Sequence, residues 1–220
     1  MVRVRTETIR YSEERATAEK AASYHVKYDK LFHKRISNSS EHALLRTLLE
    51  RVGDVDSIID IPCGTGRVSK LFAERAKRVY EFDYSREMVS RLRSSRSFYE
   101  PRVGVATAFH LPFRDRSADL SVSIRLSHHI PDFEGRCWHL RELLRVSDRF
   151  ALITFFDAAS VKNRLRELRR GLGSRKRAKF TLTRGTVAEI AASSGFEPVE
   201  FRQLSRCFSG HTFALLRRQM

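Results

Sequence analysis

The chain has 220 residues, enough for one domain with a modest appendage and too few for two full enzymatic domains. Hydrophobic residues make up 41% and charged residues 31%, a composition that excludes a disordered chain and allows a sizeable core. The formal net charge of +16 favours an anionic partner.

The number and spacing of the cysteines and the hydropathy of the chain indicate the cellular compartment of the protein. The 3 cysteines are widely spaced and form no CxxC pair, so neither a disulfide framework nor a zinc ribbon is supported, and no metal site is expected. No apolar run approaches the roughly 18 residues of a membrane span, and the N-terminus lacks an apolar signal segment. We therefore expect a cytoplasmic protein without an integral membrane segment.

The N-terminal part, from residue 12 to residue 52, is polar with leucines at helical spacing, which predicts a helical extension. Ser40 followed by Glu41 suits a helix start there. The chain then alternates short apolar strands with helices, which predicts a parallel sheet covered on both faces. Strands are expected at 57–61, 78–83, 102–108, 118–124 and 149–156, and helices at 66–76, 85–95 (capped by Ser85) and 133–146.

The C-terminal part departs from this alternation. The run TVAE (residues 186–189) predicts a capping box that opens a helix, and Gly195 predicts its end. Two strands are then expected at 196–204 and 211–218 with no helix between them. Such a pair is suited to antiparallel pairing.

The most informative motif is DIPCGTGR (residues 60–67), where the first strand meets its helix. Gly64 and Gly66 let the backbone turn sharply and approach a ligand at a helix N-terminus. Asp83 ends the second strand, where a carboxylate can accept hydrogen bonds from both hydroxyls of a ribose. The third glycine of a nicotinamide dinucleotide site is missing, since Ser69 stands there, and Asp60 would repel a pyrophosphate but attract an ammonium group.

Four segments, DIPCGTGR, FDYS, ATAFHLPFRDRSADL and LSHHI, occur in this order. Together they resemble the class I S-adenosylmethionine-dependent methyltransferases, especially the quinone-biosynthesis and related small-molecule group. The resemblance implies a Rossmann-like α/β fold: a seven-stranded, mostly parallel sheet with helices on both faces and one antiparallel strand near the C-terminus. It divides the chain into an N-terminal helical lid or extension (1–52) and a methyltransferase domain (53–220) with a basic insertion around 161–183.

The resemblance also implies S-adenosyl-L-methionine as the cofactor. Pro62 and Thr107 depart from the family pattern, which usually has glycine and often aspartate at these positions. The implied cofactor contacts are Asp60, Pro62, Cys63, Gly64, Thr65 and Gly66 for the methionine part, Asp83 for the ribose, Tyr84, Thr107 and Ala108 for the adenine, and the stretch from Ile124 through Arg125 to His129 facing the transferable methyl group.

Methyl transfer needs alignment of the two reactants and, for some acceptors, removal of a proton. His128 and His129 follow the fourth strand near the expected reaction centre, and histidine titrates near neutral pH. Either histidine can act as the base, or one can pack beneath the sheet edge as a structural residue. Of the two, we favour His129.

The acceptor is indicated only by charge. Residues 162–179 contain nine basic side chains and one acidic one, and Val161, Leu165 and Leu168 share one face of a basic amphipathic helix. We expect methyl transfer to oxygen or nitrogen of a small or lipid-linked anionic acceptor, with peripheral contact at the anionic inner membrane surface. The alternatives are an RNA methyltransferase whose basic segment binds phosphates, and a catalytically silent cofactor-binding partner subunit.

Overall fold

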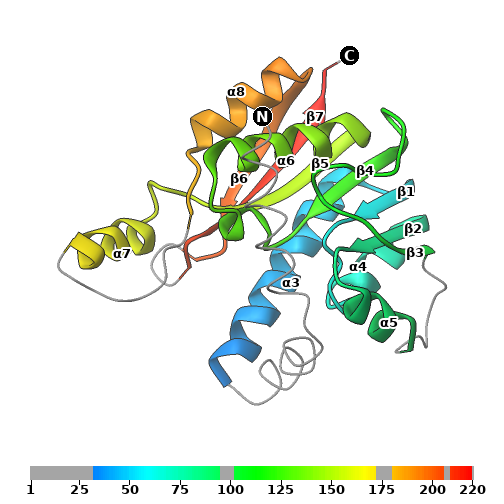
Figure 1. Ribbon diagram of the computed structural model, residues 1–220, viewed down its shortest axis with the longest axis horizontal. Helices are drawn as coiled ribbons and strands as arrows, with labels where there is room; N and C mark the ends of the chain where they lie inside the picture. Colours follow the sequence, from blue (N-terminus) through cyan, green and yellow to red (C-terminus); the bar gives the residue numbers. More distant parts are fainter. Residues whose placement is uncertain (1–31, 95–101, 172–179, 206–208, 220) are drawn as a thin grey trace.

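The computed structural model describes residues 32–94, 102–171, 180–205 and 209–219, with side chains from residue 39 on (Figure 1). Its strands are β1 (Val55–Asp60), β2 (Ala76–Asp83), β3 (Arg102–Val105), β4 (Ala118–Ser123), β5 (Ser147–Phe156), β6 (Phe196–Gln203) and β7 (His211–Arg218). Its helices are α3 (Phe32–Val52), α4 (Ser69–Ala73), α5 (Arg86–Ser94), α6 (Phe133–Val146), α7 (Val161–Gly171) and α8 (Arg184–Ser193), with a 3₁₀ turn η1 (Ser127–His129).

The strands form one seven-stranded sheet in the order β3-β2-β1-β4-β5-β7-β6. β7 pairs antiparallel with β5 and with β6, whereas the pairs among β1 to β5 are parallel. The expected sheet with one reversed strand near the C-terminus is therefore confirmed. The strand order reverses between β1 and β4, so their carboxyl ends flank the crevice where ligands bind in open α/β sheets.

Helices cover both faces of the sheet (Figure 1). On one face α6 and α8 pack with Ile59 and Ile153, and on the other α3 and α4 pack with Ile58 and Leu152. Neighbouring residues of a strand point to opposite faces, so each apolar strand supplies both cores. α3 contributes Leu45, Leu48 and Leu49, all at most 1% exposed, to the second core.

Several expected boundaries were wrong. The helix after the glycine motif is confined to α4, because β2 already begins at Ala76. β3 ends at Val105 rather than at residue 108. α8 is capped by Thr183, whose Oγ1 accepts a hydrogen bond from the Thr186 N–H (3.0 Å), so it begins before the TVAE run.

At the N-terminal side, α3 is already helical at Phe32, so Ser40 and Glu41 lie inside it and do not start it. Residues 1–31 of the expected lid lie outside the described residues, and so do residues 172–179 of the basic insertion. The division at residue 52 stays a prediction. The expected Ser85 cap is present, since its Oγ accepts a hydrogen bond from the Met88 N–H (3.3 Å).

Candidate active site

The glycine motif forms the bend between β1 and α4. Gly64 and Gly66 have φ angles of +58° and +82°, which side-chain-bearing residues rarely adopt. A Cβ on Gly64 would have no atom within 4 Å, whereas a Cβ on Gly66 would lie 2.4 Å from Leu92. Gly64 therefore leaves open space for a ligand, and Gly66 lets the bend pack against α5.

Asp83 lies where β2 ends, beside this bend. Its carboxylate accepts hydrogen bonds from the Gly64 N–H and the Ser85 N–H, both at 2.9 Å. Burial raises the pKa of Asp83, and these backbone bonds oppose that rise. A carboxylate offers about four lone-pair sites, so Asp83 keeps acceptor capacity for a ligand hydroxyl.

Asp60, the last residue of β1, is fully buried. Neither of its side-chain oxygens has a hydrogen-bond partner among the described residues. Burial and the nearby charges of Glu81 and Asp83 raise its pKa well above the usual value. A buried carboxyl group without a partner is costly, and a ligand cation would stabilise its ionised form. The ammonium and sulfonium groups of S-adenosylmethionine fit this requirement.

A buried carboxylate from α3 holds two arginines at the same site. Glu41 is 1% exposed and lies 3.0 Å from Arg67 Nη1 and 2.5 Å from Arg125 Nη2. Arg125 has a φ of +63°, and its N–H donates to Thr154 Oγ1 (2.6 Å). This cluster connects α3, the glycine bend and the end of β4, so α3 supports Arg67 and Arg125, which line the cavity.

The other end of the site is built from aromatic rings. His128 is 5% exposed and stacks on Phe156, with ring centroids 4.2 Å apart and planes 9° apart. The ring centroids of His128 and His129 are 4.0 Å apart. The ring of His211 contacts the His128 ring edge-on, with the centroids 4.7 Å apart. His129 is the more exposed of the first two. These positions suit a structural His128 and leave His129 as the candidate base.

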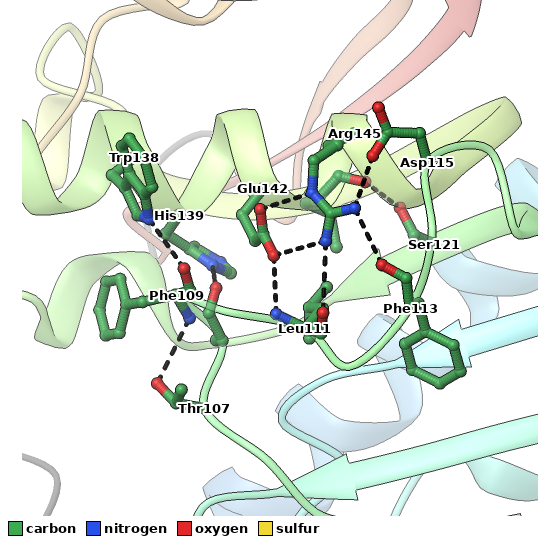
Figure 2. Close-up of polar contacts among 12 residues, drawn as sticks. Thr107, Phe109, Leu111, Phe113, Asp115, Ser121, Trp138, His139, Glu142 and Arg145 are labelled. Atoms are coloured by element: carbon green, nitrogen blue, oxygen red, sulfur yellow. Dashed lines mark hydrogen bonds and ion pairs between the residues drawn. The ribbon is translucent and has the colours of Figure 1, made fainter.

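The loop after β3 forms a further wall, and α6 holds it in place (Figure 2). Trp138 Nε1–H donates to the Phe109 carbonyl (2.8 Å), and Glu142 Oε1 accepts from the Leu111 N–H (2.7 Å). Arg145 donates to the Phe113 carbonyl (2.9 Å) and pairs with Glu142 (2.8 Å). A loop fixed at three carbonyl or amide groups keeps its wall residues in one arrangement.

These walls line one open cavity of about 580 Å³. Eleven of the thirteen predicted site residues line it: Pro62, Cys63, Gly64, Thr65, Asp83, Tyr84, Thr107, Ala108, Arg125, His128 and His129. Asp60 and Gly66 do not, because Asp60 is fully buried beneath the bend and Gly66 faces Leu92. Direct contact of these two with the cofactor is therefore not favoured by the structure.

Some residues that line or support the cavity were not predicted from the sequence. The register of β5 and β7 pairs Phe156 with His211, which brings residues 55 positions apart to one wall. No local signal indicates such a pair. Glu41 did have a signal: it stands four residues before Leu45 and seven before Leu48, which places a carboxylate on the buried helix face.

Comparison with known proteins identifies the central segment of the chain. Residues 59–152 match a family model described as a methyltransferase domain. Residues 59–152 carry a class I S-adenosylmethionine-dependent methyltransferase domain. The matched segment runs from β1 to β5 and so contains the glycine bend, Asp83 and both predicted histidines. S-adenosylmethionine is its cofactor, and the enzyme class is methyltransferase.

Solved structures share the fold of the methyltransferase. Magnesium protoporphyrin IX methyltransferase from Synechocystis PCC 6803, with bound SAH, superposes with a TM-score of 0.72 at 14% identity, covering 86% of this chain and 88% of that one. A Clostridium acetobutylicum S-adenosylmethionine-dependent methyltransferase gives 0.66 at 13% identity (90% and 99%). A Haloferax volcanii chain from a complex with the Trm112 methyltransferase activator gives 0.65 at 15% identity (85% and 93%). No curated protein matches the sequence.

Proposed function

We propose that this methyltransferase transfers the methyl group of S-adenosylmethionine to an oxygen or nitrogen of a small or lipid-linked anionic acceptor in the cytoplasm. One observation carries the proposal. A single cavity is lined at one end by the glycine bend with Asp83 and at the other by the rings of His129, Phe156 and His211. A cofactor and an acceptor can therefore lie side by side in one cavity, as an in-line transfer requires.

At the cofactor end, three residues of the chain have separate roles in binding. Asp83 accepts hydrogen bonds from ribose hydroxyls, and Gly64 lets the backbone come close to the bound cofactor. Burial raises the pKa of Asp60, and a cationic ligand above the bend favours its ionised form, so this carboxyl group can balance the ligand's charge. When bound, S-adenosylmethionine supplies a methyl group on a positively charged sulfur that is already activated for displacement.

At the acceptor end, His129 is the group that removes a proton from a hydroxyl or an amine. His128 stays stacked on Phe156 and fixes the position of its neighbour. Arg166 lies over the Phe156 ring, 5.1 Å from its centroid, and adds positive charge next to the acceptor end. This charge, together with the net charge of +16, supports an anionic acceptor. The described thiols of Cys63 and Cys137 are free and buried, which fits a reducing compartment.

Two measurements test the proposal. Calorimetric titration with S-adenosylmethionine should show binding, and radiolabelled methyl groups should then appear in a lipid or small-metabolite fraction. His129→Gln should lower the transfer rate by about a hundredfold or more, with little change in cofactor affinity. His110→Gln is the matched control, because His110 is exposed and does not line the cavity.

The outcomes separate the alternatives. Label confined to RNA would overturn the proposed acceptor in favour of nucleic acid. Tight cofactor binding without label in any fraction would favour a silent partner subunit. Unchanged transfer by His129→Gln would remove this residue from the reaction.

A further inference from the structure

α7 carries an apolar stripe that nothing in the described part of the chain covers. Val161, Leu165 and Leu168 are 61%, 42% and 63% exposed. With about 3.6 residues per turn, these three positions fall within a stripe roughly 60° wide. Figure 1 shows α7 standing away from the sheet and from the other helices. An exposed stripe of this kind marks an interaction surface.

The opposite side of α7 is anchored to the domain. The buried Asn163 Nδ2–H₂ donates to the carbonyls of Asp157 (2.8 Å) and Gly210 (3.2 Å). A Cβ on Gly210 would lie 2.4 Å from Asn163, so the two pack directly. Arg166, on the same side, contacts the Phe156 ring. The helix is therefore held with its apolar stripe facing away from the domain.

Positive charges flank the stripe. α7 contains five basic residues and one acidic residue. By helical position, Lys162 and Arg169 lie along one edge of the stripe and Arg164 along the other. Long basic side chains in these positions can reach phosphate groups while the apolar residues between them insert. A protein surface would have to supply both an acidic rim and an apolar groove, whereas an anionic bilayer offers both everywhere.

We propose that α7 docks flat on an anionic lipid bilayer, with Val161, Leu165 and Leu168 inserted and Lys162, Arg164 and Arg169 at the phosphates. None of the described helices is long and apolar enough to cross a membrane, so the contact is peripheral. One helix of this length binds a bilayer reversibly.

The docking helix is joined to the acceptor end of the cavity. Its anchor points Asp157 and Gly210 are chain neighbours of Phe156 and His211, which both line that end. Docking therefore brings the acceptor end close to the lipid headgroups. The second part of the inference rests on the proposed function: the acceptor is held in, or drawn from, the anionic bilayer surface.

Vesicle binding tests the docking without any turnover. The full chain should co-sediment with vesicles of phosphatidylcholine plus phosphatidylglycerol and remain in solution with phosphatidylcholine alone. Leu165→Asp with Leu168→Asp should weaken binding by at least about tenfold, because it replaces inserted apolar surface with charge. Val199→Asp is the matched control, since Val199 is exposed (37%) on β6.

A second pair of variants tests the charges. Arg164→Gln with Arg169→Gln should weaken binding by about thirtyfold, since each of the two cations near an anionic surface contributes about 1 kcal/mol. Arg114→Gln with Arg141→Gln removes the same charge from exposed sites elsewhere and should bind nearly as the parent does. Calorimetric cofactor affinity should be unchanged in all four variants.

Three results would overturn the docking. One is that the parent does not bind anionic vesicles. Another is that the control variants lose binding as much as the α7 variants do. The third is that the Leu165 and Leu168 substitutions dissociate a dimer in the absence of lipid, which would assign the stripe to a second copy. Cofactor binding and transfer to a water-soluble acceptor are measured separately, so failure of docking is distinct from failure of the proposed function.

Discussion

The acid sensitivity of the fold can be worked out from one buried histidine. His139 of α6 is fully buried between the cavity loop and β4. The Ala108 carbonyl can only accept, so His139 Nδ1–H donates to it (3.1 Å) and Nε2 accepts from the Ser123 hydroxyl (2.9 Å). This pattern needs a neutral ring. Burial accordingly lowers the pKa of His139 from 6.5 to about 4.

The sign follows from comparing the folded and unfolded chains. Above pH 6.5 the ring is neutral in both, and His139 makes no pH-dependent contribution. As the pH falls from 6.5 towards 4, only the unfolded chain takes up the proton, and the free energy of unfolding falls. The loss is about 2 kcal/mol at pH 5 and about 3 kcal/mol once both pKa values are passed.

Urea unfolding at pH 7 and at pH 5 measures this loss. The variant His139→Phe with Ser123→Ala removes the titrating ring and the hydroxyl that it would leave unpaired. It should be less stable than the parent at pH 7, yet lose about 2 kcal/mol less between the two pH values. His42, whose pKa is also lowered by burial, is present in both chains and cancels in the comparison. An equal loss in parent and variant would refute a neutral, buried His139.

Three further substitutions have defined outcomes. Asp83→Asn should weaken S-adenosylhomocysteine binding by about tenfold or more in calorimetry, because an amide replaces the ionised acceptor of the ribose hydroxyls. Asp60→Asn should raise the urea midpoint at neutral pH, because it removes a carboxyl group whose raised pKa makes ionisation unfavourable. The parent, but not Asp60→Asn, should release protons on binding S-adenosylmethionine, seen as a calorimetric enthalpy that depends on the buffer. Glu41→Gln should lower the free energy of unfolding by about 3 kcal/mol, because it leaves two arginines without their buried partner, and the exposed Glu50→Gln on the same helix should not.

The sheet could be predicted from the sequence because each strand is a short apolar run whose neighbours are helices or turns. Apolar runs such as that of β5 have one dominant outcome, burial between two layers. The wrong element bounds lie where the local signals for helix, turn and strand are weak and compete with one another. Between Gly66 and Ala76 the apolar residues have helical spacing. The first residues of this segment nevertheless belong to the glycine bend, and the last one begins β2.

The candidate site could be predicted only where it is local in sequence. The bend from Pro62 to Gly66 and Asp83 follow directly from strand ends, since a strand end fixes where its next residues lie. The aromatic wall depends instead on the register that sets His211 opposite Phe156. Pairing register between strands far apart in the sequence is determined by tertiary packing, which a single sequence does not display.

Opposite charges in two separate parts of the domain explain how a chain of net charge +16 can bind a cationic cofactor. Glu81 and Asp83 are buried at the glycine bend together with Asp60, which ionises when a cation binds, and in this low-dielectric setting these carboxyl groups determine the local field. The cations of α7 lie on the exposed side, where salt screens them over about 10 Å at 0.1 M. Raising the salt concentration should therefore release the chain from anionic vesicles while S-adenosylmethionine affinity stays within about twofold. If both affinities fell together in parallel salt titrations, the two fields would not be separate.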